Sequence, residues 1–414
     1  MKPFWGLLPH RIEQAITGGW VRKFRAKYQR RNDSPAMAPA RHSPRRLYVD
    51  LAVISRDDAG TGIQRVVRAL ALALTEQGTK EWDLYFVAAD RRRPYHEISW
   101  PEAGAVVDPT EIAGRPGDLF LGLDFSLNTI RRYRRQLIRF RRNGGRFWFL
   151  ICDLLPVEKP EWFSSGNVTR YKAWLDTIVG ISDGFLCISA QTESDLKRVL
   201  EARYGLTGGY RTSIVPMGHD IRESRRDGRA IASPPESGRF DTSIPFSLMV
   251  GTLEPRKGHA DILAAFSELW REGGENRLVL VGRMGWHVEK LRDTILTHSE
   301  YGGKLLWFDD VDDLELEAIY QACEGVIIAS HAEGFGLPLI EALGHGKPVL
   351  ARDLPIFSMH QGLGVCYFPS GAKSTDLALC IQRWTNAVQT GQIKVIRPSV
   401  GWQDSAKVLL SSIA

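Results

Sequence analysis

The 414-residue chain has few cysteines and no long apolar run. Its five cysteines are scattered, with no CxxC pair, which excludes a disulfide scaffold and favours reduced thiols. No segment approaches the roughly 18 to 20 uninterrupted apolar residues of a membrane-spanning helix. The best apolar run, Phe147 to Leu155, is broken at Asp153. Because the amino-terminal residues also lack a secretory apolar core, we predict a cytoplasmic protein.

Motifs that would mark several other chemistries are missing as well. There is no Walker A lysine loop, no zinc-ligand spacing and no GxSxG nucleophile elbow. The full GxGxxG dinucleotide fingerprint is also missing, since the nearest match is the GTG at 60–62. A nicotinamide-dependent oxidoreductase would need that fingerprint and an acid about 20 residues further on, so this class is disfavoured.

Positive charge is concentrated at the start of the chain. The net charge is +6, but residues 1–46 hold eleven Lys or Arg against two acids, a net +9, so residues 47–414 carry −3. A second basic block, Arg131–Arg146, is rich in arginine, with apolar breaks at Leu137 and Phe140. Three interpretations stay open: a solvated surface with a flexible tail, attraction to an anionic membrane surface, or nucleic-acid binding. No helix-turn-helix, zinc-finger or RNP signature supports the last, and we expect no nucleic-acid partner.

Apolar strands alternate with amphipathic helices along the rest of the chain. Runs such as RFWFLIC, FSLMVG and GVIIAS are continuously apolar, which is typical of parallel sheets covered on both faces. A Pro-, Gly- and Ser-rich stretch near 225–245 interrupts the alternation, which then restarts. We therefore predict an α/β fold of two Rossmann-like, doubly wound domains facing a central cleft, at 47–235 and 236–398, preceded by a basic tail or linker at 1–46.

The most informative segment is HAEGFGLPLIEALGHG at 331–346, which follows a strand and opens a helix. If Pro338 is the first helical residue, the backbone N–H groups before it form an anion site at a helix N-terminus; they belong to Gly334, Phe335, Gly336 and Leu337. Glu341 then falls in the first helical turn, where its carboxylate can accept two ribose hydroxyls. Glu333, on the loop, can accept hydroxyls of a second polar group. The alternative is that Glu341 is a favourable first-turn acid and Glu333 a loop charge.

Two further strand-to-helix junctions carry functional signals. In VGTLEPRKGHADIL, at 250–263, the adjacent cations Arg256 and Lys257 would bind a diphosphate beside a helix N-terminus; the alternative is a solvated basic turn. In DDAGTGIQR, at 57–65, Gly60 and Gly62 form a glycine loop between a strand and a helix.

In this order, in two tandem α/β halves, these motifs resemble the retaining glycosyltransferases of family 4, which have the two-lobed GT-B fold. The resemblance covers roughly residues 47–412, and EPRKG with the E-GFGLP-E pattern carries it. TGIQRVVR resembles a subgroup that builds bacterial surface polysaccharides, many of whose members transfer mannose from GDP-mannose. PSVGWQDSAKVLL resembles the final helix of that subgroup, so we expect a C-terminal helix at 399–414 that packs back on the N-terminal domain.

The resemblance implies an acceptor domain at 47–235 and a nucleotide-sugar donor domain at 236–398. Lys257 and Arg256 would neutralise the donor diphosphate and act in catalysis together with Glu333, which would contact the sugar. Glu341 would hold the nucleotide ribose. The remaining donor-binding positions are Gly60, Gly62, Gly334, Phe335, Gly336 and Leu337.

One position departs from the family pattern. Where many relatives have a histidine near the transferred sugar, this chain has Cys152 followed by Asp153. We therefore keep Cys152 and Asp153 as candidates for the acceptor or sugar side and name no general base.

The resemblance implies a hexosyltransferase that moves mannose, with retention, to a lipid-diphosphate-linked saccharide in polysaccharide biosynthesis. The protein would be peripheral on the inner face of the cytoplasmic membrane, held through its basic N-terminal segment and Arg131–Arg146. We expect no cofactor and no obligatory metal, because the acidic pairs at 309–310 and 312–313 precede a helix and are expected to cap it or to border the base pocket. Two alternatives stay open: a donor of the UDP-glucose type, and a catalytically silent sugar-nucleotide-binding scaffold.

Overall fold

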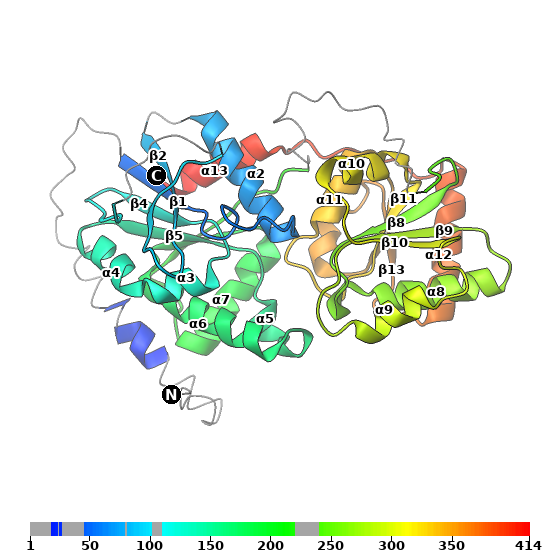
Figure 1. Ribbon diagram of the computed structural model, residues 1–414, viewed down its shortest axis with the longest axis horizontal. Helices are drawn as coiled ribbons and strands as arrows, with labels where there is room; N and C mark the ends of the chain where they lie inside the picture. Colours follow the sequence, from blue (N-terminus) through cyan, green and yellow to red (C-terminus); the bar gives the residue numbers. More distant parts are fainter. Residues whose placement is uncertain (1–17, 24, 27–44, 79–80, 102–109, 220–239) are drawn as a thin grey trace. The chain divides into compact units, whose positions relative to one another are not determined.

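The computed structural model describes residues 18–23, 25–26, 45–78, 81–101, 110–219 and 240–414. The chain divides into two compact α/β units (Figure 1). The first contains the chain up to residue 59, residues 63–216 and residues 403–414, and the second contains residues 217–402, with 60–62 grouped to it. The predicted fold class, two doubly wound units in tandem, is confirmed. The predicted boundary at 235 and 236 lies outside the described residues.

The first unit is built on a seven-stranded sheet in the order β3-β2-β1-β4-β5-β6-β7. Six of its strands are parallel: β1 (Arg45–Asp50), β2 (Trp82–Ala88), β4 (Leu119–Gly122), β5 (Arg146–Ile151), β6 (Gly184–Cys187) and β7 (Arg211–Ile214). β3 (His96–Glu97) pairs antiparallel at one edge. All residues of β4 and β6 are buried, as expected for central parallel strands with apolar side chains on both faces.

Helices cover both faces of this sheet (Figure 1). On one side lie α2 (Gly62–Gln77) and α13 (Trp402–Ile413), and on the other α3 (Leu127–Arg132), α4 (Arg134–Arg142), α6 (Ser165–Ile181) and α7 (Ala190–Tyr204). Short turns at α5 (Leu155–Glu158) and η2 (Pro160–Trp162) follow β5. The end of α13 is tied to the sheet by Arg146, which donates to the carbonyl of Ile413 at 3.1 Å, and by Ser412, whose hydroxyl lies 2.7 Å from that of Ser213.

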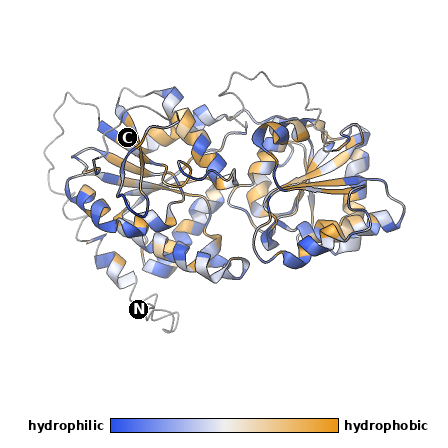
Figure 2. Cartoon of the chain, in the orientation of Figure 1, coloured by the Kyte–Doolittle hydropathy of each residue, from blue (hydrophilic) through white to orange (hydrophobic). Residues whose placement is uncertain are grey.

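The second unit has a six-stranded sheet in the order β10-β9-β8-β11-β12-β13. Its strands are all parallel: β8 (Phe246–Val250), β9 (Arg277–Val281), β10 (Leu305–Phe308), β11 (Gly325–Ile328), β12 (Val349–Arg352) and β13 (Val365–Phe368). One face carries α8 (His259–Arg271), α9 (Glu289–Leu296) and α12 (Ser374–Gln389), and the other carries α10 (Asp313–Ala322) and α11 (Leu337–Gly344). Apolar residues dominate the central strands of both units, while the helices carry both apolar and polar residues (Figure 2).

The strand order of the second sheet reverses between β8 and β11. From β8 the chain runs outward to β9 and β10, then returns to β11 on the other side of β8. The loops that leave the carboxyl ends of β8 and β11 therefore diverge from a common point, and open α/β sheets bind ligands at such a point.

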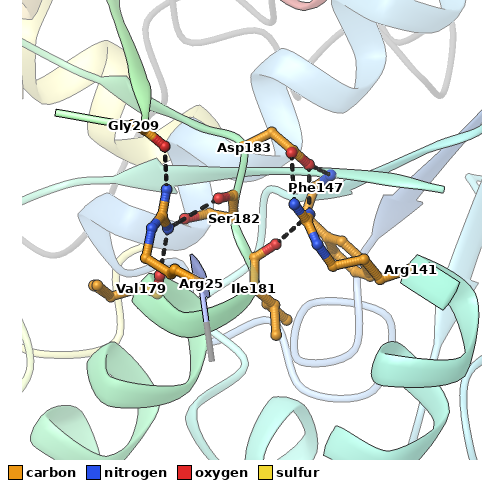
Figure 3. A network of polar contacts seen from close by, with 8 residues as sticks. All are labelled: Arg25, Arg141, Phe147, Val179, Ile181, Ser182, Asp183 and Gly209. Carbon is orange, nitrogen blue, oxygen red and sulfur yellow. Dashed lines mark hydrogen bonds and ion pairs between the residues drawn. The ribbon is translucent and has the colours of Figure 1, made fainter. Parts of the chain in front are cut away.

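The described part of the basic N-terminal segment packs on the first unit. Residues 18–23 are helical, and the side chain of Arg25 is buried at the end of α6 (Figure 3). Its guanidinium donates to the carbonyls of Val179 at 2.5 Å, Ser182 at 3.0 Å and Gly209 at 2.5 Å. Residues 18–23 and 25–26, predicted as part of a tail or linker, thus pack on the unit, to which Arg25 contributes hydrogen bonds. The rest of the predicted tail before β1, residues 1–17 and 27–44, lies outside the described residues.

The second basic block also contributes to the interior of the first unit. Arg141, at the end of α4, forms a bidentate ion pair with Asp183, in which its two terminal nitrogens lie 2.7 and 2.8 Å from the carboxylate oxygens (Figure 3). The same carboxylate accepts the backbone N–H of Phe147 at 2.8 Å. Arg141 is therefore a structural residue, unlike the exposed arginines of α3 and α4. None of the helices in the described ranges has an apolar stretch long enough to cross a bilayer.

Candidate functional site

The two predicted motifs of the second unit meet at its switch point. The loop after β8 contains the short helix η4 (Pro255–Lys257), which carries Arg256 and Lys257. The backbone N–H of His331, in the loop after β11, donates to the carbonyl of Arg256 at 2.7 Å. Gly258 has a φ of +69°, and a Cβ at this position would overlap the carbonyl oxygen of Ala329. The two loops are thus held closely together, at a place where only glycine fits.

Glu333 lies at the centre of this junction and contacts both predicted cations. Its Oε1 accepts from the Lys257 ammonium at 2.5 Å and from the Ser330 hydroxyl at 2.6 Å. Its Oε2 accepts from the Arg256 guanidinium at 3.0 Å. The Glu333 side chain is only 8% exposed. Three of the predicted site residues are thus brought into direct contact, although Glu333 is 76 residues from Lys257 in the sequence.

The charges of this cluster balance. Arg256 also pairs with Glu254, at 2.7 Å, so two cations face two carboxylates. Burial by itself would raise the pKa of Glu333, but the charges of Lys257 and Arg256 outweigh it and lower the pKa to about 2. Glu333 is therefore ionised at neutral pH. Two clustered cations can bind an anionic group here when they exchange their carboxylate partners for it.

The N-terminus of α11 follows directly. Gly336 is the N-cap with a φ of +92°, and a Cβ there would overlap the ring of Phe357. Phe335 is buried. The helix begins at Leu337, so Pro338 is its second residue and Glu341 its fifth. The expectation that Glu341 lies in the first helical turn is therefore wrong, because the glycine cap starts the helix one residue earlier than the proline suggested.

Glu341 is buried within the second unit, with only 4% of its surface exposed. Its Oε2 accepts the hydroxyl of Tyr320, on α10, at 3.0 Å. The Tyr320 ring stacks on that of His345, with centroids 5.1 Å apart and an angle of 9°. A residue of α10 thus contributes to holding the Glu341 carboxylate in place.

A buried arginine at the end of β12 stabilises this junction of loops through side-chain hydrogen bonds. Arg352 donates to the carbonyl of Ala329 at 2.9 Å, to that of Ser370 at 2.7 Å and to the Asp261 carboxylate at 2.5 Å. His331 lies 3.3 Å from the same carboxylate. These contacts tie the loops after β11 and β13 to the first turn of α8, which follows η4.

The acidic pair at 312–313 has a structural role at one of its positions. The Asp312 carboxylate accepts the backbone N–H of Glu315 at 2.8 Å and so caps α10, as predicted. Among the described residues, no group of three or more His, Cys, Asp or Glu side chains is arranged to hold a metal ion.

The predicted glycines of the first unit lie in the loop between β1 and α2. Gly60 is exposed with a φ of +65°, and Gly62 is the first residue of α2. The base of this loop is held by Asp124, which follows β4 and accepts the backbone N–H groups of Val53 at 2.5 Å and Ile54 at 2.9 Å. The loop is thus anchored at the switch point of the first sheet, between β1 and β4.

Cys152 and Asp153 follow β5, also in the first unit. Burial, and then the charges of Asp153 and Asp124, raise the pKa of Cys152 well above its usual value, so its sulfur is a protonated thiol. The Asp153 carboxylate accepts the backbone N–H of Leu155 at 3.1 Å. Burial and the charges of these carboxylates thus disfavour the thiolate, which is the nucleophilic form of cysteine.

Sequence reasoning missed three side chains that shape the site. Glu254 belongs to the EPRKG motif itself, and its position beside Arg256 was a usable signal. Ser330 is the second residue after β11 and lies three residues before Glu333, which also gives it a traceable position. Tyr320 is 21 residues from Glu341 on a different helix, and no spacing marks it.

The chain is similar to known glycosyltransferases in sequence and in structure. Residues 234–362 match the family model described as "Glycosyl transferases group 1". The "Serotype-specific mannosyltransferase WbdA" of Escherichia coli is 32% identical over 371 residues, covering 84% of this chain and 44% of that protein. The chain thus spans less than half the length of this curated relative.

Two solved structures share the fold across most of the chain. WaaG, "a glycosyltransferase involved in lipopolysaccharide biosynthesis", has a TM-score of 0.54 at 14% identity, with coverage of 88% of this chain and 95% of WaaG. HepE of Anabaena in complex with UDP-glucose has a TM-score of 0.56 at 14% identity, with coverage of 89% and 94%. The family model and the match to WbdA place the chain in the group 1 glycosyl transferases, family 4, and the likeness to the two solved structures shows its GT-B fold.

Proposed function

We propose that this protein is a retaining hexosyltransferase that transfers mannose from GDP-mannose to a lipid-diphosphate-linked saccharide in bacterial polysaccharide biosynthesis. The observation that carries the proposal is the cluster of Arg256, Lys257 and Glu333 at the switch point of the second sheet, beside the N-terminus of α11. The likeness to a protein named as a mannosyltransferase supports the choice of sugar.

The cluster suits the binding of a nucleoside diphosphate sugar. Arg256 and Lys257 would exchange their contacts with Glu333 for the oxygens of the diphosphate, to which arginine offers a bidentate fork. The N–H groups at the start of α11, capped by Gly336, would face the same negative charge. Glu333, released from the cations, would then accept hydroxyls of the sugar. Glu341 would hold the nucleotide ribose.

The proposed reaction exchanges one bond at the anomeric carbon. The bond from C1 to the β-phosphate oxygen breaks, and its electron pair leaves with the nucleoside diphosphate. The bond from C1 to the acceptor oxygen forms on the same face, and the acceptor's proton passes to the departing phosphate oxygen. Negative charge builds on the diphosphate during this step, so Lys257 and Arg256 stabilise the transition state more than the ground state.

The basic surface of the first unit supports the proposed location and, through it, the proposed acceptor. We propose that exposed arginines of α3 and α4, together with the exposed side chain of Trp20, hold the protein on the anionic inner face of the cytoplasmic membrane. Arg134 lies 5.7 Å from the Trp20 ring centroid, so the two segments share one patch. A lipid-linked acceptor would then be presented at the same surface.

A donor panel tests the proposal. We would incubate the purified protein with GDP-, UDP-, ADP- and dTDP-sugars and measure release of the nucleoside diphosphate. We expect slow release from GDP-mannose, reduced by roughly a hundredfold or more in Lys257→Ala, the scale of one lost transition-state contact. Lys290→Ala, on the exposed face of α9, is the matched control and should behave as wild type.

The panel separates the competing interpretations. Release from a UDP-sugar alone would replace the proposed donor and keep the enzyme class. Near-full activity of Lys257→Ala would remove this residue from the mechanism. A nucleotide-induced shift in melting temperature without turnover of any donor would favour the catalytically silent sugar-nucleotide-binding scaffold, and the lack of both would count against nucleotide-sugar binding altogether.

A further inference from the structure

The first unit contains a cavity that the proposed reaction does not use. Its volume is about 470 Å³, which lies within the range of roughly 300–1,000 Å³ of pockets for small ligands. It is lined mainly from β2, from the segment after β3 and from the helices α2 and α13, so it belongs to one unit alone. We call it the edge cavity; its polar and aromatic lining residues include Thr75, Asp83, Tyr85, Glu97 and Trp100.

The edge cavity lies beside the amino-terminal half of β2. There, Trp82–Tyr85 pair with β1 on one side, while β3 reaches only the end of β2, where Glu97 pairs with Val87. Among the described residues, no strand therefore covers the outer side of this half of β2. The glycine loop at 60–62 and Cys152 follow the carboxyl ends of the parallel strands β1 and β5. A ligand in the edge cavity would thus lie toward the opposite end of the strands from these candidate site residues.

Two aromatic side chains give the edge cavity flat apolar walls. Tyr85 and Trp100 are half-buried, so each ring is only partly covered by the protein. The Trp100 ring packs edge to face against the ring of Phe86, with centroids 4.9 Å apart and an angle of 66°. Such packing fixes a ring before a ligand arrives, which lowers the entropy that binding loses.

The polar groups of the edge cavity are carboxylates and hydroxyls. Asp83 is exposed, and its carboxylate has no hydrogen-bond or ion-pair partner among the described residues. Glu97 supplies a second carboxylate, and Thr75 a hydroxyl. No Lys, Arg or His of the described chain lines the cavity. The polar part of its wall thus consists mainly of hydrogen-bond acceptors.

This lining disfavours anionic and purely apolar ligands. A phosphate or nucleotide would meet two carboxylates and no lining cation; Arg45, whose guanidinium lies 4.2 Å from the Trp82 ring centroid, is already paired with Glu81 at 3.2 Å. A hydrocarbon chain would remove the carboxylates from water without replacing their hydrogen bonds. A neutral saccharide suits both parts of the wall, because its hydroxyls donate to carboxylates and the C–H faces of its rings pack on aromatic side chains.

We propose that the edge cavity is a second saccharide-binding site, which holds a neutral sugar unit of the acceptor away from its reacting end. The choice of ligand rests on the proposed function, in which the acceptor is a saccharide chain. Asp83 accepts hydroxyls of the bound sugar, and Tyr85 and Trp100 contact its ring faces. No bond forms or breaks here, so the site affects the affinity for the acceptor and leaves the chemical step unchanged.

Binding of α-linked mannotriose to the full chain, measured by calorimetry without donor, tests this inference. We expect Asp83→Ala to weaken binding roughly tenfold, the scale of a lost hydrogen bond to a charged group. Thr75→Trp, near the end of α2, places a large side chain in the cavity and should abolish binding. Because both positions are exposed, the two variants should fold, and their release of GDP from GDP-mannose in the donor panel should match the wild type.

Glu201→Ala is the matched control. Glu201 is an exposed carboxylate on α7 of the same unit and does not line the cavity, so this variant should bind mannotriose as the wild type does. Binding that is unchanged in both Asp83→Ala and Thr75→Trp would place the sugar elsewhere and refute the inference. A wild type that does not bind mannotriose would refute it too, while the transferase proposal is still decided by the donor panel.

Discussion

At the scale of single residues, the site is organised by ion pairs that serve binding and folding at once. Glu333 is ionised because two partly buried cations face it, and without Glu333 the Lys257 ammonium would lose the carboxylate that it contacts. Breaking one side of such a buried pair is costly because it leaves the other charge uncompensated. The same three side chains must then rearrange around a diphosphate. The donor-free site is thus stable, and it can exchange partners.

The depressed pKa of Glu333 makes its contribution to stability depend on pH. Its pKa falls from an ordinary 4.5 to about 2 on folding, so the stabilisation is fully present above pH 4.5 and is lost as the pH falls toward 2. By linkage this is on the order of 3 kcal/mol. We expect Glu333→Gln to be less stable than wild type in urea at pH 7, with the gap narrowing below pH 4.5. A gap that stays constant down to pH 3 would contradict this. Glu289→Gln, exposed on α9, should unfold like wild type at each pH.

At the scale of elements, the central parts of the fold could be predicted and the edges could not. β8, β9 and β11 are continuous apolar runs, so composition alone marks them. β7 and β13 lie at the edges of their sheets, and β7 has the sequence RTSI with none of its residues buried. An edge strand needs fewer apolar residues because one side faces solvent. No periodic signal therefore identified β7.

The features of the candidate site also divide into those that the sequence could predict and those that it could not. The motifs placed Arg256, Lys257 and Glu333 at strand-to-helix junctions, because glycine and proline mark such turns in the sequence. Their mutual pairing depends on which strands are neighbours, and β8 and β11 are 78 residues apart where they pair at Gly325 and Ser247, a spacing with no local sign. The hydrogen bond from Tyr320, on α10, to Glu341 also joins residues that no local spacing connects. Local chemistry was thus predictable, and contacts set by topology were not.

One element-scale prediction concerns the N-terminal segment. Arg25 donates to carbonyls at the carboxyl end of α6, where a cation also meets the helix dipole favourably. Arg25→Ala would leave these buried carbonyls without their donor, and we expect a loss of about 2–4 kcal/mol in unfolding free energy. Urea midpoints would measure it, with Lys23→Ala, an exposed neighbour, as the control. Equal midpoints for the two variants would show that the segment adds nothing to the stability of the first unit.

At the scale of the whole molecule, charge and structure are distributed unevenly. Residues 1–46 and Arg131–Arg146 hold most of the excess positive charge, yet Arg25 and Arg141 are used inside the first unit. A test of membrane binding by deleting the first 40 residues would therefore remove a structural contact together with the surface charge. Substitutions at exposed positions avoid this, because they change the charge and leave the packing of residues 18–26 intact.

The last prediction therefore changes only exposed arginines and leaves the buried ones in place. Four exposed arginines of α3 and α4 are changed together to glutamine: Arg131, Arg132, Arg134 and Arg135. Since each basic residue near an anionic surface contributes roughly 1 kcal/mol, binding to phosphatidylglycerol vesicles should fall by on the order of a hundredfold or more. Co-sedimentation measures it, with phosphatidylcholine vesicles as the uncharged reference. The control removes the same charge from the second unit, at Lys290, Lys373, Arg383 and Lys394. Equal loss in both variants would mean that binding follows net charge alone, and the patch on α3 and α4 would have no special role.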